Sequence, residues 1–121
     1  MPDDWRNLAR NARMRVTGND LEITFPRGRR QVVTVDEAGR QLRLWSIVAR
    51  QSQVDDDVRQ YAWRRNRLSE FVGFRVDARG RLIGESYVPE GVSADEWAFL
   101  VHKLAAASDH FQYLLTGRDT E

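Results

Sequence analysis

A long predicted helix near the end of the chain limits most strongly what this sequence can fold into. It runs from Ser93 to Leu115 and carries apolar side chains on two faces. One face has the helical spacing of a stripe that covers a sheet, and its members are Trp97, Leu100, Val101, Leu104, Ser108, Phe111 and Leu115. The opposite stripe consists of Phe99, His102, Ala106, His110 and Tyr113. Because a small domain has a single core, this second stripe favours contact with a partner.

Both ends of this helix carry recognisable signals. Ser93 and Glu96 have the spacing of a capping box, and Val92 and Trp97 have that of the hydrophobic staple that often accompanies it. Gly117 suits the C-terminal cap, where glycine adopts a left-handed conformation easily. The helix is therefore expected to begin at Ser93 and to end just before Gly117.

Length and composition favour one domain, residues 1–121, in the cytoplasm. The 121 residues suffice for one core, and 41% hydrophobic content separates the chain from disordered proteins. The chain has no cysteine, which excludes disulfides, zinc thiolate clusters and thiol chemistry. A net charge of +1 argues against dedicated nucleic-acid binding. No apolar run is long enough to cross a membrane, and no membrane partner is expected.

A short helix is predicted at the N-terminus. Asp3 or Asp4 can cap it, and apolar residues then recur at helical spacing: Trp5, Leu8, Ala9 and Ala12. The segment 17–20 contains glycine followed by Asn and Asp, which is turn chemistry, and it is expected to end the helix.

The rest of the chain alternates between strand and helix patterns. A second helix is expected after Asp55, because three aspartates precede the apolar spacing of Val58, Tyr61, Ala62, Arg65 and Leu68. Five strands are expected at 21–25, 32–35, 42–48, 72–76 and 82–87. These elements predict an α+β fold, an antiparallel five-stranded sheet with helices packed on it, in the order α-β-β-β-α-β-β-α.

Catalytic and metal-binding interpretations have little support. Asp55, Asp56 and Asp57 are better explained as helix caps than as ligands, since no loop of alternating ligands surrounds them. His102 and His110 start about 12 Å apart along one helix, too far to hold one metal as a pair. No metal site is therefore expected.

Possible acid, base and nucleophile residues also lack supporting patterns. Glu85 and Glu90 can be paired on paper for acid and base chemistry, and His110 can be paired with Asp109. No nucleophile elbow and no glycine-rich phosphate loop is present. The sequence therefore predicts that the protein is not an enzyme and has no cofactor.

The closing segment resembles members of the YbjN family of the type III secretion chaperone-like fold. The resemblance lies in Asn66 at the end of the second helix, 74–77, 80–83, 88–89, and the helix that opens at 92–93 and reaches Leu104, Asp109, Leu114 and Leu115. It implies a curved antiparallel sheet with packed helices, usually in a homodimer that binds protein without a cofactor. Secretion chaperones of this fold bind an extended effector segment. Many of them are acidic, whereas this chain has balanced charge.

The main hypothesis is a non-catalytic protein-binding module, chaperone-like or regulatory, that acts as a homodimer and presents a sheet edge and apolar grooves to an extended polypeptide. Its expected contact residues are Trp63, Phe99, Ala106 and Tyr113. The alternative is a nucleic-acid-binding adaptor with an N-terminal arginine-rich surface, formed by Arg6, Arg10, Arg13, Arg27, Arg29 and Arg30.

Overall fold

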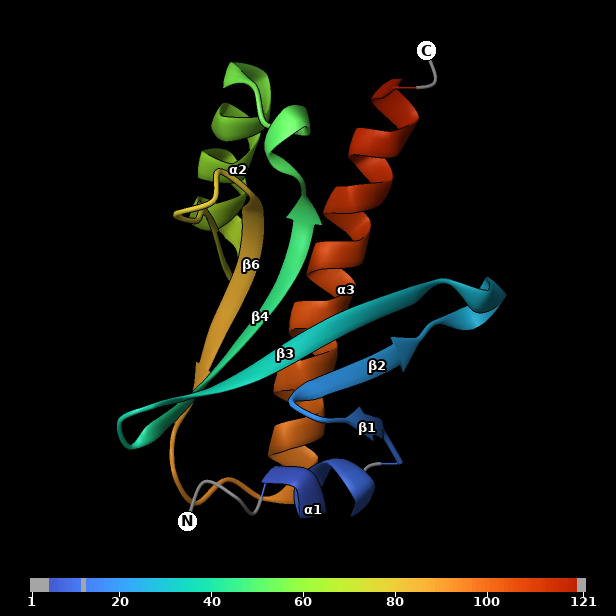
Figure 1. The fold of residues 1–121 in the computed structure, drawn as a ribbon, viewed down its shortest axis with the longest axis vertical. Helices are drawn as coiled ribbons and strands as arrows, with labels where there is room; N and C mark the ends of the chain where they lie inside the picture. The colour runs from blue at the N-terminus through green and yellow to red at the C-terminus, as the bar shows by residue number, and fades with distance from the viewer. Residues whose placement is uncertain (1–4, 12, 120–121) are drawn as a thin grey trace.

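The computed structural model, which describes residues 5–11 and 13–119, folds around a six-stranded antiparallel sheet (Figure 1). Its helices and strands are α1 (Trp5–Asn11), β1 (Arg15–Thr17), β2 (Asp20–Thr24), β3 (Arg30–Ala38), β4 (Gln41–Ala49), α2 (Asp56–Leu68), β5 (Gly73–Val76), β6 (Leu82–Val88) and α3 (Ala94–Asp119). Short 3-10 turns occur at Pro26–Gly28 and Gln51–Gln53. The predicted fold class, an α+β fold with helices on an antiparallel sheet, is confirmed.

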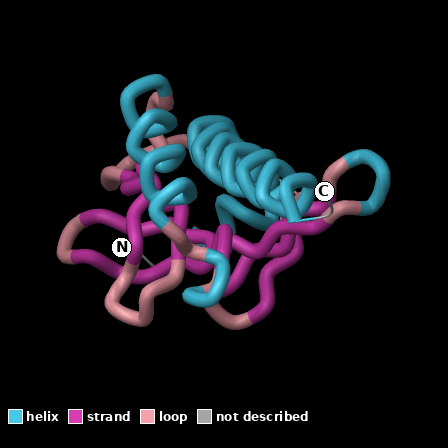
Figure 2. The backbone as a smooth tube through the Cα atoms, turned by 90° about the horizontal axis from the view of Figure 1, so that it is seen from above, coloured by secondary structure: helices cyan, strands magenta, loops and turns pink. Residues whose placement is uncertain are grey.

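The strands lie in the order β1-β2-β3-β4-β6-β5. The first four follow one another as a meander, and the chain then passes through α2 before β5 and β6 join the free side of β4. Helix α3 packs across one face of the sheet, against β3, β4 and β6 (Figure 2). Helix α1 lies at the beginning of α3, and α2 lies beside the later part of α3 and contacts β5 (Figure 1).

The sequence analysis predicted five strands and missed β1. Arg15–Thr17 pairs with β2, with Val16 opposite Leu21. The glycine turn that was expected to end the first helix instead joins two strands, and Gly18 has a φ of 61° there. A strand of three residues has too few positions to show an alternating pattern. It is stabilised by pairing with its neighbour, which the local sequence does not reveal. The order of helices and strands along the chain is therefore α-β-β-β-β-α-β-β-α.

The predicted helix starts are confirmed where the structure describes them. The Ser93 hydroxyl accepts from the Glu96 amide at 3.1 Å, and the Ser93 amide donates to the Glu96 carboxylate at 2.9 Å. Asp55 accepts from the Val58 amide at 2.8 Å. The predicted caps Asp3 and Asp4, and Ala12 of the first apolar stripe, lie outside the described residues.

The predicted end of the last helix is wrong. Helix α3 continues through Gly117 to Asp119. Glycine ends a helix only where the chain turns into a left-handed conformation, and the residue type permits that turn without requiring it.

The core lies between α3 and the sheet. Trp97, Val101, Leu104 and Phe111 of the predicted buried stripe are almost completely buried. Their neighbours across the core are the inward-facing residues of the strands, among them Leu21, Ile23, Val33, Val35, Leu44, Val48, Phe74, Leu82 and Val88. Trp5 of α1 stacks on Trp97 with ring centroids 6.0 Å apart, which attaches the first helix to the start of α3. Among the described residues, no helix combines the length and apolar character needed to cross a membrane.

Strands β3 and β4 pair only over part of their length and then diverge (Figure 1). The backbone pairing of the two strands ends at Thr34 and Trp45. In the part of β3 before Thr34, side-chain hydrogen bonds connect the strands instead. Gln31 donates to the Ser46 hydroxyl at 2.7 Å, and that hydroxyl donates to the Val32 carbonyl at 2.7 Å. Val32 of β3 and Ile47 of β4 alternate with buried neighbours and are exposed on the outer face of the sheet.

Candidate binding groove

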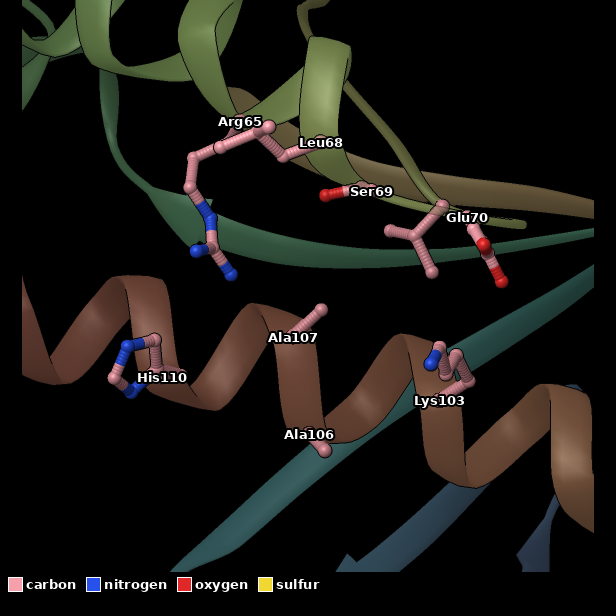
Figure 3. Close-up of a pocket in the computed structure, with 9 residues that line it drawn as sticks. Arg65, Leu68, Ser69, Glu70, Lys103, Ala106, Ala107 and His110 are labelled. Carbon is pink, nitrogen blue, oxygen red and sulfur yellow. The ribbon is translucent and has the colours of Figure 1, made fainter.

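A groove of about 550 Å³ separates α2, and the loop that follows it, from the outer side of α3 (Figure 3). Nine residues line it: Arg65, Leu68, Ser69, Glu70, Val72, Lys103, Ala106, Ala107 and His110. They come from two segments far apart in the sequence, which the fold brings face to face. We refer to this cavity as the α2–α3 groove.

The side chain of Asn66 fixes the wall of the groove to the sheet. Its amide nitrogen donates to the Phe74 carbonyl at 2.8 Å, and its amide oxygen accepts from the Phe74 amide at 2.7 Å. β5 is the last strand of the sheet. These two hydrogen bonds satisfy backbone groups of β5 that a neighbouring strand would otherwise bind. An edge closed in this way resists pairing with another chain. The α2–α3 groove, rather than the β5 edge at Phe74, is therefore the open site in this part of the molecule.

The loop between α2 and β5 holds Phe71 in an unusual conformation. Its φ of 68° lies in the left-handed region, which a bulky side chain adopts only at a cost in free energy. The Phe71 ring packs edge-on against Phe99 of α3, with centroids 5.7 Å apart and planes at 85°. Phe71 is 59% exposed and Phe99 is 53% exposed. A strained loop thus supports a solvent-exposed aromatic pair next to the groove, and we call this pair the aromatic rim.

Cations without acidic partners also line the groove. Nε of Arg65 is buried and has no hydrogen-bond partner among the described residues. Lys103 lies over the Phe99 ring at 5.9 Å, within the range of a cation–π contact. Among the described residues neither side chain takes part in a salt bridge, whereas Arg43 is paired with Glu85 at 2.7 Å. The groove therefore combines apolar surface with two cations that no salt bridge among the described residues pairs.

The structure brings two of the four expected contact residues to this site. Phe99 belongs to the aromatic rim, and Ala106 lines the groove. Trp63 lies on the outward side of α2, 61% exposed, with Arg67 stacked on its ring at 5.1 Å.

Tyr113 lies two helical turns beyond Ala106 on α3. It is 57% exposed, and Arg29, which follows the 3-10 turn before β3, covers its ring at 4.9 Å. The outer surface of α3 thus carries Phe99, Ala106 and Tyr113 at intervals of seven residues, which places them on one side of the helix. We call these three residues the outer seam of α3.

Sequence reasoning missed Phe71, Leu68, Arg65 and Lys103 as site residues. Leu68 and Arg65 were assigned to the inward stripe of the second helix, yet Leu68 is 80% exposed. The helical period shows that they share a face, but it does not show where the core beneath that face ends. A weak signal was available for Phe71, since a large aromatic between Glu70 and Val72 follows polar helix-ending residues.

The N-terminal arginines of the nucleic-acid alternative are spread over several contacts within the chain. Arg6 donates to the Gly18 carbonyl at 3.1 Å and to the Asn19 side chain at 2.8 Å. Arg29 forms a salt bridge with Asp109 at 3.0 Å. Arg10 contacts Asn7, and Arg30 lies 3.9 Å from Glu22. Arg13 lines a small cavity beside β2. The side chain of Arg27 lies outside the described part of the structure.

Glu85, considered above as an acid or base, has a structural environment. It lies on the face of the sheet opposite α3, between Arg43 at 2.7 Å and Arg75 at 2.6 Å. Burial raises the pKa of this carboxyl, but the hydrogen bonds from Arg75 and Arg43 outweigh it, so the pKa lies below its ordinary value. A carboxylate held ionised by two guanidinium groups is poorly suited to donating a proton.

The other candidate groups do not form a site with Glu85. Glu90 is exposed in the turn after β6, and Asp109 is paired with Arg29. His102 and His110 line different cavities, the former beside β2 and the latter in the α2–α3 groove. Within residues 5–11 and 13–119, no cluster of three His, Asp or Glu side chains is arranged to bind a metal.

The overall architecture is shared with known structures. No protein-family model matches the chain, and no curated protein is significantly similar to it. Among solved structures, YbjN of E. coli, a proposed transcription regulator, superposes with a TM-score of 0.66, at 14% identity, over 99% of this chain and 92% of that one. The chain has the type III secretion chaperone-like fold. The resemblance to YbjN and to secretion chaperones that was stated from the sequence is thus confirmed as a likeness of fold.

Two further similar structures contain secretion proteins. The heterodimeric ExoU–SpcU complex from the type III secretion system of Pseudomonas aeruginosa matches with a TM-score of 0.62, at 20% identity, over 94% of this chain and 97% of that one. The type III secretion chaperone SycH of Yersinia pestis, in complex with a stable fragment of YscM2, matches with a TM-score of 0.55, at 10% identity, over 88% and 94%.

Proposed function

We propose that this chain is a non-catalytic protein-binding module, chaperone-like or regulatory, that acts as a homodimer and holds an extended polypeptide segment. The observation that carries the proposal is the aromatic rim of Phe71 and Phe99 beside the α2–α3 groove. Two large side chains stay exposed there although burial of each is worth about 1.5–3 kcal/mol. A strained φ at Phe71 keeps one of them in that position. Strain of this kind persists where the surrounding structure enforces it and often accompanies a binding role.

Solved structures with the same fold include complexes with other proteins, which supports a polypeptide as the ligand. SycH is a secretion chaperone in complex with a fragment of another protein, and ExoU–SpcU is a heterodimeric complex. The groove offers apolar surface at Val72, Ala106 and Ala107 and polar groups around it, the combination that anchors a side chain while leaving the backbone accessible.

The homodimer part of the proposal rests on the outer seam of α3. Phe99 and Tyr113 are exposed on the same side of a helix, about 21 Å apart along its axis, with the small residue Ala106 between them. A small side chain between two aromatics lets a second helix approach closely while the aromatics pack at either end. We assign the contact role to this seam, together with the exposed Trp63 of α2.

Sedimentation velocity tests the dimer. The unchanged chain is expected to sediment as a dimer at micromolar concentration, and the variant Phe99→Asp with Tyr113→Asp as a monomer. The matched control is Val32→Asp with Ile47→Asp, which places the same charges on another exposed apolar pair. A monomeric unchanged chain contradicts the homodimer. A dimer that only the control variant disrupts places the contact on the sheet and contradicts the seam.

Binding to an unfolded polypeptide tests the groove. A permanently unfolded probe such as reduced, carboxymethylated lactalbumin is expected to bind the unchanged chain in a fluorescence titration. Phe71→Ser is expected to weaken that binding by about tenfold, since one apolar anchor of the aromatic rim is lost while Phe99, which also belongs to the outer seam, stays in place. Val32→Ser serves as the control and should bind as the unchanged chain does. Equal binding by both variants contradicts the role of the aromatic rim.

A further inference from the structure

We propose that the α2–α3 groove selects an acidic polypeptide segment, one that carries a carboxylate side chain three or four residues from a large apolar side chain. This inference rests on the proposed function and adds the chemistry of the ligand. It follows from the charges that face the groove and from their distance to the aromatic rim.

Among the described residues, no salt bridge pairs the two cations of the groove, Arg65 and Lys103. Arg65 approaches from α2 and Lys103 from α3, and Figure 3 shows the Arg65 guanidinium pointing across the groove toward α3. Glu70 is the one acidic residue in the lining, and among the described residues no salt bridge joins it to either cation. In Figure 3 the Arg65 guanidinium lies beside Ala107 and His110, and Lys103 lies further along α3. A carboxylate that enters the groove is attracted by both cations.

Arg65 is well suited to recognise that carboxylate. The Nε–H of Arg65 is buried and has no partner among the described residues, whereas the guanidinium end of the side chain points into the groove (Figure 3). A carboxylate that approaches the fork can accept two parallel hydrogen bonds, the geometry that makes arginine pairs with carboxylates strong and directional.

The position of the aromatic rim sets the spacing within the ligand. From Phe99 to Ala107, beside the Arg65 guanidinium in Figure 3, the helix advances eight residues, about 12 Å. An extended polypeptide covers this distance with three or four residues, at about 3.3 Å each. A segment lying along the groove therefore places an apolar side chain on the rim and a carboxylate at Arg65.

Single-stranded nucleic acid also binds surfaces where cations and aromatics alternate, but this groove is less suited to it. The lining between the cations consists of the small aliphatic residues Val72, Ala106 and Ala107, which offer no flat surface on which a base can stack. Phe71 and Phe99 already pack on each other edge-on. The observations favour a polypeptide.

Fluorescence anisotropy with the full chain tests the proposal with four labelled probes. Three are short peptides of equal length: one with Glu and Phe at the proposed spacing, one with Lys in place of Glu, and one with Ser in place of Phe. The fourth is an oligothymidine. The Glu–Phe peptide is expected to bind about tenfold more tightly than either other peptide, the difference expected when one charge pair or one anchor is lost.

Charge reversal in the protein provides the decisive comparison. Arg65→Glu with Lys103→Glu is expected to invert the preference, so that the Lys–Phe peptide binds more tightly. Arg59→Glu with Arg40→Glu changes the net charge equally at exposed positions outside the groove and should leave the preference unchanged. Because Arg65 is half-buried, Lys103→Glu alone is measured as well, and it is expected to abolish the preference for the acidic peptide without perturbing the fold.

Each outcome separates this inference from the proposed function. If the Glu–Phe and Lys–Phe peptides bind equally and the reversal variant changes nothing, the acidic preference is wrong while the peptide-binding groove stands. If no peptide binds but carboxymethylated lactalbumin does, the inference fails and the proposed function stands; if neither binds, both fail. If the oligothymidine binds more tightly than every peptide and Lys103→Glu abolishes its binding, the groove is a nucleic-acid site and the inference is overturned.

Discussion

Gly84 of β6 lies directly against Ser108 of α3. A Cβ atom on Gly84 would be 2.6 Å from the Ser108 hydroxyl oxygen and 3.2 Å from the Leu104 and Phe74 side chains, so the helix packs on the strand at a distance that only glycine permits. The Ser108 hydroxyl is buried and has no hydrogen-bond partner among the described residues. Its value at this position is its small size, because α3 must approach the sheet closely for the other residues of its inward face to reach the core.

Gly84→Ala is therefore expected to lower the free energy of unfolding by about 1–3 kcal/mol, since the added methyl group overpacks the contact. Ser108→Gly, combined with Gly84→Ala, is expected to recover part of that loss by making room. Ser108→Ala alone should be close to neutral, because it removes a buried hydroxyl that has no partner. Denaturant unfolding of these three variants, of Ser108→Gly alone and of the unchanged protein measures these values. An additive double variant would show that the two residues are not in contact.

Asn66→Ala is expected to destabilise the fold by about 1–3 kcal/mol, because the variant leaves the amide and carbonyl of Phe74 without their partners. Hydrogen exchange at the Phe74 amide should accelerate in the same variant, and the opened β5 edge should promote self-association at high concentration. Asn7→Ala, on the exposed side of α1, is the matched control. Unchanged exchange at Phe74 would contradict the role assigned to the Asn66 amide.

Glu85 is expected to make stability depend on acidity. Because the pKa of Glu85 is lowered below its ordinary value of 4.5 in the folded protein, its stabilisation is present above that value and is lost as the pH falls through the lowered pKa. The pKa of Arg75 is raised by its hydrogen bond with Glu85, which is consistent with this assignment. At about pH 7, Glu85→Gln should lower the free energy of unfolding by about 1–3 kcal/mol, and the difference should shrink at about pH 3.

The control for this measurement is Glu90→Gln, which removes an exposed carboxylate from the turn after β6. Its effect should be small at both acidities, since exposed charges contribute little to stability. If the difference in free energy of unfolding between Glu85→Gln and the unchanged protein is the same at both pH values, the charge of the Glu85 carboxylate is not the cause of the pH dependence.

Replacement of Phe71 should separate strain from binding. Phe71→Gly and Phe71→Ala both remove the contact with Phe99, but only glycine adopts a φ of 68° without a steric penalty. The glycine variant is therefore expected to be more stable than the alanine variant by about 1 kcal/mol, measured by denaturant unfolding. Both should bind an unfolded polypeptide less tightly than the unchanged chain. A glycine variant that is no more stable than the alanine variant would show that position 71 carries no strain.

The elements that were predicted well are those with local causes. The capping box of Ser93 and Glu96 and the cap at Asp55 lie within four residues of the backbone groups they bind, so their sequence spacing specifies the contact. The second hairpin is likewise local, since Asp77 accepts from the Arg79 and Arg81 amides. Strand β1 was missed because it is stabilised by β2 rather than by any pattern of its own.

The sequence by itself determined which faces of α3 are apolar, because the helical period follows from the order of the residues alone. It therefore indicated Phe99 and Ala106 as surface residues, and it indicated the fold through the order and polarity of its elements. Only the tertiary structure decided that α2 and its loop lie beside that surface, that Leu68 faces the groove instead of the core, and that Phe71 meets Phe99. These relations depend on how closely two segments approach after the chain between them has folded, and that distance is set by packing across the sheet, at contacts such as that of Gly84 with Ser108.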